Sequence, residues 1–194
     1  MPDRSPLEPL TALGGRDPHQ ERIGAVTITE RPDLALASLA ARRGAALDAG
    51  LDGLALPGPG GHASGPDGTG ALWIGPDAWL VEGPLDAPGA LAARLKARHG
   101  DSASVTDQTD AWVCFDIAAD DLAAVMERLA GLDLRAMPAG RGTRTIIDHL
   151  GCLVILREAG RRASILGPRS SADSLLHALT AAARAVEALK GIAA

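Results

Sequence analysis

The sequence predicts an α+β fold made of two β-α-β-β-α-like halves, in which antiparallel sheets take packed helices. Short runs with alternating or β-branched residues are typical of strands, and alanine- and leucine-rich segments with helical spacing lie between them. In addition, residues 78–97 (AWLVEGPLDAPGALAARLKA) and residues 162–181 (RASILGPRSSADSLLHALTA) share the order strand, Gly-Pro turn, capped start and helix. This weak internal repeat is what indicates two similar halves.

The expected organisation is an arm followed by one domain. Residues 1–22 are polar and rich in proline and glycine, which predicts a flexible N-terminal arm and a possible docking strap for a partner. Residues 23–194 would form a single domain, whose pseudo-repeated halves cover about 23–100 and 104–190. A chain of 194 residues is long enough to bury such a core without a metal or a disulfide.

In the first half, the alternation from Ile23 to Glu30 predicts a strand. Residues 34–43 (LALASLAARR) suit a strand or a helix, and we expect a strand because the repeat matches them to residues 111–117 (AWVCFDI). Residues 45–57 then suggest a short helix, and the glycine-rich stretch Pro57–Gly70 a surface loop.

The first half ends in a hairpin and a helix. The apolar runs 71–75 and 78–83 are joined by Gly75-Pro76-Asp77, which predicts a tight turn. Asp86 is the expected N-cap of a helix through LAARLKARH, with Pro88 in its first turn.

The second half follows the same order. Its expected elements are strands at 104–107 and 111–117, a helix from Asp120 or Asp121 to Gly131, strands at 142–150, 151–158 and 161–167, and a long helix after the capping box Ser170–Asp173. In that last helix an apolar stripe is formed by Leu175, Leu179, Ala182, Val186 and Leu189.

Charge and composition exclude several function classes. The net charge of -5 and only four aromatic residues argue against a nucleic-acid partner. Cys114 and Cys152 lie in apolar runs, which favours buried thiols and a reducing compartment. No stretch has the length of a membrane span or a signal peptide, so we expect a cytoplasmic protein.

No motif assembles into an active site. Residues 58–63 (GPGGHA) fit a dinucleotide-binding glycine pattern only loosely, and neither a P-loop nor a serine-hydrolase elbow around Ser64 is present. Asp148, His149 and Cys152 supply too few ligands for a closed metal site. The remaining histidines show no ligand spacing: His19, His62, His99 and His177.

Arginine outnumbers lysine by 17 to 2. An anion-binding or subunit-docking face and an ordinary solvated surface both remain open for the arginines that follow the second helix. They are Arg135, Arg141, Arg144, Arg157, Arg161, Arg162 and Arg169. The pair Asp120-Asp121 is better explained as a helix start than as a general acid and base.

The segment Trp73–Val81 (WIGPDAWLV) resembles a tryptophan-bearing segment of the gamma subunits of heterotetrameric sarcosine oxidases. Further matches, covering about residues 23–185 in total, are ITERPDLALASLAARRG, SVTDQTDAWVCFDI, LDLRAMPAGRGTRT and ILGPRSSADSLLHAL. The chain departs from that pattern at three places. Ala78 stands where the family often has glutamate, and the cysteine that commonly precedes the segment at Gly131–Leu134 is missing. The loop Pro57–Gly70 is also unusually rich in glycine.

The resemblance implies a fold similar to the folate-binding domain of aminomethyltransferases. It implies a non-catalytic structural subunit, with alpha, beta and delta subunits as partners, in a complex that demethylates sarcosine to glycine. Tetrahydrofolate would accept the one-carbon unit, and oxygen would be reduced to hydrogen peroxide. FAD, FMN, NAD and zinc are expected in the partner subunits, so no catalytic, cofactor-binding or metal residue is carried over to this chain.

Two questions stay open at the level of the sequence. Trp73 and Trp79 have equal parity on the hairpin if no bulge intervenes, so they would present two large surfaces on one face. We expect one of them in the core, and the other stays open between the core and a partner. The alternative function is a free-standing folate-binding or aminomethyltransferase-like protein, which would need an acidic residue for the pterin ring. Asp107 and Asp110 are candidates, although both also suit turns at a strand end.

Overall fold

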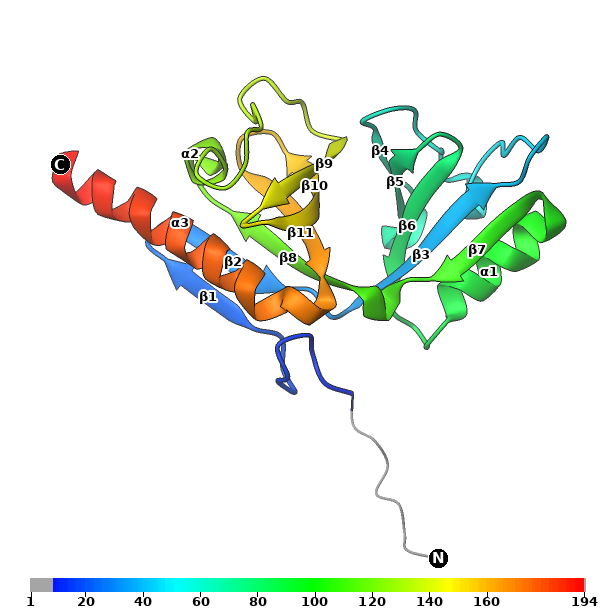
Figure 1. Cartoon of the computed structure of the whole chain (residues 1–194), viewed down its shortest axis with the longest axis horizontal. Coiled ribbons are helices and arrows are strands. Elements are labelled where there is room, and N and C mark those ends of the chain that lie inside the picture. Colours follow the sequence, from blue (N-terminus) through cyan, green and yellow to red (C-terminus); the bar gives the residue numbers. More distant parts are fainter. Residues whose placement is uncertain (1–8, 194) are drawn as a thin grey trace, which may run out of the picture.

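The computed structural model describes residues 9–193, which form two antiparallel sheets with helices on their outer faces (Figure 1). The six-stranded sheet has the order β1 (Gln20–Ile23), β2 (Val26–Glu30), β8 (Trp112–Ala118), β11 (Arg162–Pro168), β10 (Leu150–Glu158) and β9 (Arg141–Ile147). The five-stranded sheet has the order β4 (His62–Ser64), β5 (Gly70–Gly75), β6 (Ala78–Pro84), β3 (Leu34–Ala41) and β7 (Ala103–Asp107). The predicted α+β class with antiparallel sheets is confirmed.

The two halves of the chain exchange their first strands: β2 of the first half lies in the six-stranded sheet, and β7 of the second half lies in the five-stranded sheet. The chain leaves β2 in the six-stranded sheet and enters β3 in the other, and it later crosses back from β7 to β8. The sheets therefore share the inner order β2-β8-β11-β10-β9 and β7-β3-β6-β5-β4, in which corresponding strands occupy corresponding places. The internal repeat of the sequence is thus a repeat of the fold, although each half supplies a strand to the sheet of the other.

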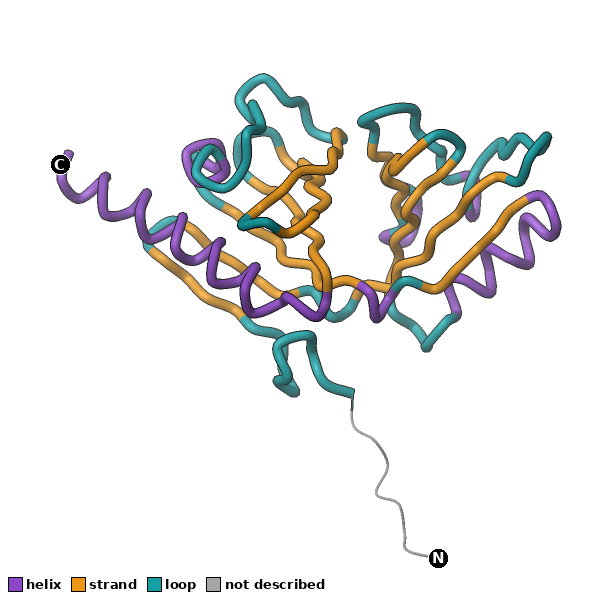
Figure 2. The backbone as a smooth tube through the Cα atoms, viewed as in Figure 1, coloured by secondary structure: helices purple, strands orange, loops and turns teal. Residues whose placement is uncertain are grey.

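Helices cover the outer face of each sheet (Figure 2). Helix α3 (Ala172–Ala193) and the short α2 (Leu122–Met126) pack on the six-stranded sheet, around buried residues such as Phe115. Helix α1 (Ala90–His99) packs on the five-stranded sheet through Leu91 and Leu95. The stripe on α3 is buried at four of its five predicted positions, whereas Leu189 is 52% exposed.

A third apolar cluster fills the space between the sheets. Leu36, Leu72 and Leu80 come from the five-stranded sheet and meet side chains of the six-stranded sheet, including Leu153 and Leu166. Because alternate residues of a strand point to opposite faces, each central strand contributes to this inner cluster and to the outer core at once.

The strand expected at 34–43 is present as β3, and the hairpin at Gly75-Pro76-Asp77 is present, with Asp77 at φ 51° in the turn. The short helix expected within 45–57 is wrong, since that segment has only the 3₁₀ turn Leu51–Gly53. The residue before this turn is Gly50, which has no side chain that could accept a capping hydrogen bond.

Two further helix predictions need correction. Asp86 does not cap α1: the helix begins at Ala90, after Gly89 with φ 72°, a conformation that glycine adopts without a steric penalty. Helix α2 is capped by Asp121, whose carboxylate accepts from the amide of Ala124 at 3.2 Å, but it ends at Met126 rather than near Gly131.

The N-terminal arm is more ordered than its composition suggests. Residues 1–8 lie outside the described residues, but Gln20–Ile23 forms β1 and pairs with β2. The buried carboxylate of Glu30 accepts hydrogen bonds from the amides of Leu13 at 3.3 Å and His19 at 3.1 Å. The polar sequence of the arm is therefore held by backbone bonds, which hydrophobic periodicity does not reveal.

The loop expected at Pro57–Gly70 joins the two sheets. It contains β4, and the amide of His62 donates to the carbonyl of Gly140 at 2.9 Å, while the amide of Gly142 donates to the carbonyl of Gly60 at 3.1 Å. These bonds connect β4 to the start of β9 across the sheet edges. Within residues 9–193, none of the helices combines the length and the hydropathy that a membrane span requires.

Candidate functional site

A bidentate ion pair between Glu82 and Arg157 lies between the two sheets. The Arg157 guanidinium donates from Nη1 to Oε1 of Glu82 at 2.6 Å and from Nη2 to Oε2 at 2.7 Å. The Glu82 side chain is 8% exposed and that of Arg157 is 19% exposed. Two parallel charge-assisted bonds in a shielded place are the strong form of this interaction.

The strands position both residues by alternation. Leu80 belongs to the cluster between the sheets, so Glu82, two residues further along β6, points the same way. On β10, Leu153 and Ile155 belong to that cluster, and Arg157 follows them at an irregularity in the pairing with β11. Such bulges re-aim a side chain next to a site.

Hydrogen bonds extend the pair in both directions. Toward β4, Nε2 of His62 lies 2.8 Å from Oε1 of Glu82 and 3.1 Å from Nη1 of Arg157. In the other direction, Nε of Arg157 donates to Oγ of Ser164 at 2.8 Å, and that hydroxyl donates to Oδ1 of Asp116 at 2.5 Å. Arg31 completes the series by donating to Oδ2 of Asp116 at 2.8 Å. We call these six residues the central network: Arg31, His62, Glu82, Asp116, Arg157 and Ser164.

The network controls the protonation of Glu82. Burial alone would raise the pKa of this carboxyl, but the hydrogen bonds from Arg157 and His62 and their charges outweigh it and lower the pKa to about 2. Burial would likewise lower the pKa of Arg157, but Glu82 raises it. Both groups are therefore ionised at neutral pH.

A polar cavity of about 300 Å³ opens beside the central network, lined by Arg31, Glu82, Asp116, Arg157 and Arg162 together with the loop around Thr69. Its two carboxylates are both bound by arginine side chains, Glu82 by Arg157 and Asp116 by Arg31. A carboxylate that is already bound by arginine is poorly placed to accept a proton or to bind a ligand. The arrangement is suited to holding the two sheets together.

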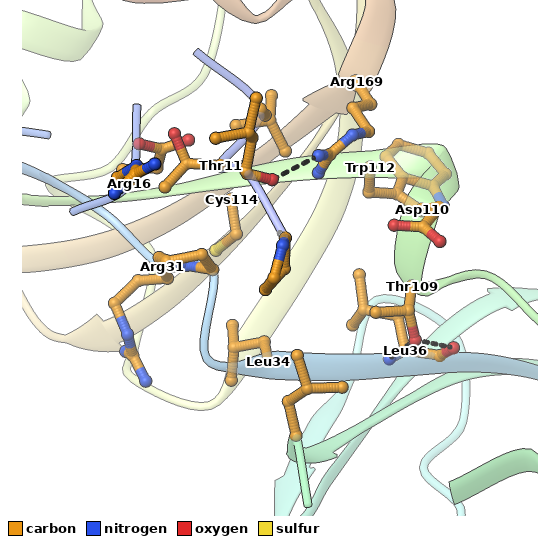
Figure 3. A pocket seen from close by; sticks show the side chains of 17 residues that line it. Thr11, Arg16, Arg31, Leu34, Leu36, Thr109, Asp110, Trp112, Cys114 and Arg169 are labelled. Carbon is orange, nitrogen blue, oxygen red and sulfur yellow. Dashed lines mark hydrogen bonds between the residues drawn. The ribbon is translucent and has the colours of Figure 1, made fainter. Parts of the chain in front are cut away.

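A second cavity of about 300 Å³ lies where the strands cross between the sheets (Figure 3). We call it the Trp112 cavity, after the indole that lines it. The N-terminal segment from Pro9 to Ala12 and Arg16 contribute to its wall. Arg169, which directly follows β11, donates from Nη2 to the carbonyl of Leu10 at 2.9 Å and so attaches this segment.

The arginines that the sequence groups together do not share one face. Arg157 is in the central network, Arg169 is at the Trp112 cavity, and Arg161 and Arg135 pair with acidic residues near α2. Of the two alternatives that the sequence left open, these positions do not support one anion-binding or docking face formed by all of the arginines. Only Arg157 of these four lies on a strand, whereas Arg135, Arg161 and Arg169 lie in the connections outside β10 and β11.

The acidic candidates are divided in the same way. Asp107 accepts from the amide and the hydroxyl of Thr109, at 3.0 and 2.7 Å, and so acts as a turn former. Asp110 lines the Trp112 cavity. Asp120 pairs with Arg161 at 3.0 Å. Neither Asp107 nor Asp110 lies in the polar cavity of the central network.

The metal and dinucleotide candidates gain no support. Asp148 and His149 form the turn between β9 and β10, both with positive φ, and Cys152 is buried in the core under α3. Among the described residues, no group of three or more histidine, cysteine, aspartate or glutamate side chains could hold a metal ion. The segment Gly58–Ala63 runs into β4 and not into a helix, so it lacks the geometry of a dinucleotide loop.

Of the central network, the sequence analysis offered only Arg157 as a candidate, among the arginines. It missed Arg31, His62, Glu82, Asp116 and Ser164 as members of a site. The available signal for Glu82 was a charged residue in the apolar run of β6, at the same parity as Leu80. His62 carried no such signal, because a histidine in a glycine-rich stretch is ordinarily exposed, whereas this side chain is 3% exposed.

Trp73 and Trp79 are directly paired across the hairpin and both contact the core under α1. Trp79 is 8% exposed, and its Nε1 donates to the carbonyl of Pro57 at 2.8 Å. Trp73 is partly buried. The two rings share one face because the residues are directly paired, although the register shifts between Trp73 and Gly75, and Trp79 is the more deeply buried of the two.

The exchanged strands, the paired sheets and the outer helices define a class of fold that solved structures share. The sequence matches no protein-family model and no curated protein. The glycine cleavage system aminomethyltransferase T from Bartonella henselae superposes with a TM-score of 0.58, at 16% identity, over 80% of this chain and 48% of that chain. This chain therefore has an aminomethyltransferase-like fold and spans about half the length of that protein.

A more similar structure is the heterotetrameric sarcosine oxidase from Corynebacterium sp. U-96, in complex with pyrrole 2-carboxylate. One of its chains is 26% identical and superposes with a TM-score of 0.73, over 84% of this chain and 87% of that chain. The likeness thus extends over nearly the whole length of both chains.

Proposed function

We propose that this protein is a non-catalytic structural subunit, of the gamma type, in a heterotetrameric sarcosine oxidase complex. The observation that carries the proposal is the likeness to a chain of the Corynebacterium complex over 84% of this chain and 87% of that one. The Trp73–Val81 segment, which resembles the gamma subunits, adds sequence support at the hairpin that closes the α1 core.

The central network supports a structural role. Its carboxylates, Glu82 and Asp116, are bound by arginine side chains, and its bonds connect the two sheets instead of presenting reactive groups. In this proposal the partners are alpha, beta and delta subunits, which bind FAD, FMN, NAD and zinc, and tetrahydrofolate is the co-substrate of the complex. The complex works in the cytoplasm, oxidising sarcosine to glycine and reducing oxygen to hydrogen peroxide.

The test is to isolate the affinity-tagged full chain from its native cells. We expect three companion chains by mass spectrometry, flavin absorbance in the purified material, and sarcosine-dependent peroxide production. An unrelated protein with the same tag, purified in parallel, controls for proteins that bind the tag or the resin. A colourless chain that elutes alone would contradict the proposal.

The same preparation distinguishes the alternative of a free-standing folate-binding protein. That function predicts saturable binding of tetrahydrofolate to the isolated chain, with loss of binding when Asp110 is replaced. The buried carboxylate Glu82 is already bound by Arg157, so Asp110 at the Trp112 cavity is the acidic side chain that this function would use. Tight folate binding by a chain without companions would favour this function over the proposed one.

A further inference from the structure

The Trp112 cavity has the size and walls of a small-ligand site. Its volume of about 300 Å³ is at the lower end of the range for ligand pockets, which run from roughly 300 to 1,000 Å³. Leu34, Leu36, Leu85 and Val113 give it apolar walls, and the Trp112 indole gives it an aromatic one. A ligand that fits must therefore have a compact apolar part.

Most of the charged groups at this cavity are already satisfied. Glu30 accepts two backbone amides, from Leu13 and His19. Arg31 is bound on both sides, by Asp33 at 2.8 Å through two nitrogens and by Asp116 at 2.8 Å. Arg16 also has a partner. These side chains hold the N-terminal segment and the crossing strands in place, so they shape the cavity and are not available to a ligand.

Two charges of opposite sign remain. Among the described residues, the carboxylate of Asp110 has no hydrogen-bond or ion-pair partner, and Arg169 uses only Nη2, on the carbonyl of Leu10. The two are not paired with each other within the described part of the chain, although both line the cavity. Figure 3 shows them near Trp112, with Leu34 and Leu36 further along the cavity.

A ligand that complements this arrangement carries one negative and one positive charge close together, and an apolar group. We propose that the Trp112 cavity binds a free α-amino acid with an apolar side chain. Its carboxylate pairs with Arg169, and its ammonium group lies between Asp110 and the face of the Trp112 indole. Its side chain packs against Leu34 and Leu36. This inference is independent of the proposed function.

The probe is L-phenylalanine, added to the full-length chain in a calorimeter and, in parallel, while tryptophan emission is recorded. We expect saturable heat and a change in emission. Trp112→Phe should remove most of the emission change and keep the heat, because Trp73 and Trp79 lie in the α1 core and not at this cavity. L-phenylalaninamide, which lacks the carboxylate, and N-acetyl-L-phenylalanine, which lacks the ammonium group, should bind roughly tenfold more weakly or worse.

Two variants assign the charges. Asp110→Asn and Arg169→Gln should each weaken L-phenylalanine binding by a similar factor. The matched controls are Asp120→Asn and Arg161→Gln, which alter an exposed ion pair that does not line the cavity. Arg169 also attaches the N-terminal segment, so binding by its variant is compared with binding by the wild-type protein only if the two unfold at the same temperature. Asp110→Asn removes no contact among the described residues and therefore tests the role of its charge independently of folding.

Absence of binding at millimolar L-phenylalanine would overturn the proposal. Equal binding by Asp110→Asn, or equal binding of either single-charge analogue, would also overturn it, because the site would then not recognise a zwitterion.

Discussion

Glu82 on β6 and Arg157 on β10 stand 75 residues apart in the sequence and in different sheets, yet they form a buried bidentate ion pair. Each half of the chain thus supplies one charge. Each charge depends on the other in this position, because the partial burial that strengthens the pair also penalises a lone ion. The pair therefore connects the two sheets by charge-assisted hydrogen bonds, in addition to their apolar contacts.

Replacing Glu82 with glutamine should destabilise the protein by about 3–5 kcal/mol, since the Arg157 guanidinium would remain buried without its counter-charge. Chemical denaturation of the full chain measures this. Glu158→Gln is the matched control, because Glu158 is an exposed carboxylate at the end of β10. It should change the free energy of unfolding by less than about 0.5 kcal/mol.

The double variant Glu82→Leu/Arg157→Met should be less destabilised than Glu82→Gln, since an apolar pair leaves no uncompensated charge between the sheets. If it were the least stable of the three proteins, the ion pair would contribute net stability.

Stability should also depend on pH through Glu82. Its pKa is about 2 in the folded protein and near the ordinary 4.5 in the unfolded chain, so the unfolded chain takes up a proton first as the pH falls. The contribution, on the order of 3 kcal/mol, is fully present above pH 4.5 and is lost as the pH falls from 4.5 toward 2. Denaturation midpoints measured across this window should fall more steeply for the wild-type protein than for Glu82→Gln. Parallel curves would show that other carboxylates dominate.

The tryptophan pair provides a further prediction. Trp79→Ala should cost roughly 3–5 kcal/mol, because the ring is buried in the α1 core and its indole N–H is bonded to Pro57. Trp79→Phe should cost less, mainly the lost hydrogen bond of about 1 kcal/mol plus a small cavity. Trp73→Ala, at the partly buried position, should lower the free energy of unfolding by less than Trp79→Ala does. A stable Trp79→Ala protein that lost its partner chains would instead identify Trp79 as an interface residue.

The sequence predicted the repeated parts of this fold and missed what is unique to one half. The repeat identified β3 as a strand although its alanines suited a helix, because β8 occupies the same place in the other sheet. The same repeat contained a signal for Glu82 that the sequence analysis did not use: the apolar Leu166 stands at the equivalent position, opposite Cys114 as Glu82 is opposite Leu36. A charged residue in one repeat at the position of an apolar residue in the other therefore indicates a polar contact that is unique to one half.

Other features could not be predicted, because they depend on contacts between distant segments. The exchange of β2 and β7 between sheets leaves no local pattern, and the burial of His62 requires β9 to bind the glycine-rich loop. The start of α1 was misplaced because proline and aspartate both suit a first turn, whereas the positive φ of Gly89 decided the boundary.

Gly70 provides the last prediction, since the central network leaves no room for a side chain there. A Cβ atom at this position would lie 2.5 Å from Oε1 of Glu82 and 2.8 Å from Nε2 of His62. Because both atoms are fixed by hydrogen bonds, Gly70→Ala should displace the pair and destabilise the protein by roughly 1–3 kcal/mol. Gly151→Ala is the matched control: it is also a strand glycine, but nothing lies within 4 Å of the place that its new methyl group would take, so it should be neutral or slightly stabilising. Combining Gly70→Ala with Glu82→Gln then tests the mechanism, because a clash that acts through the ion pair should add little once that pair has already been broken.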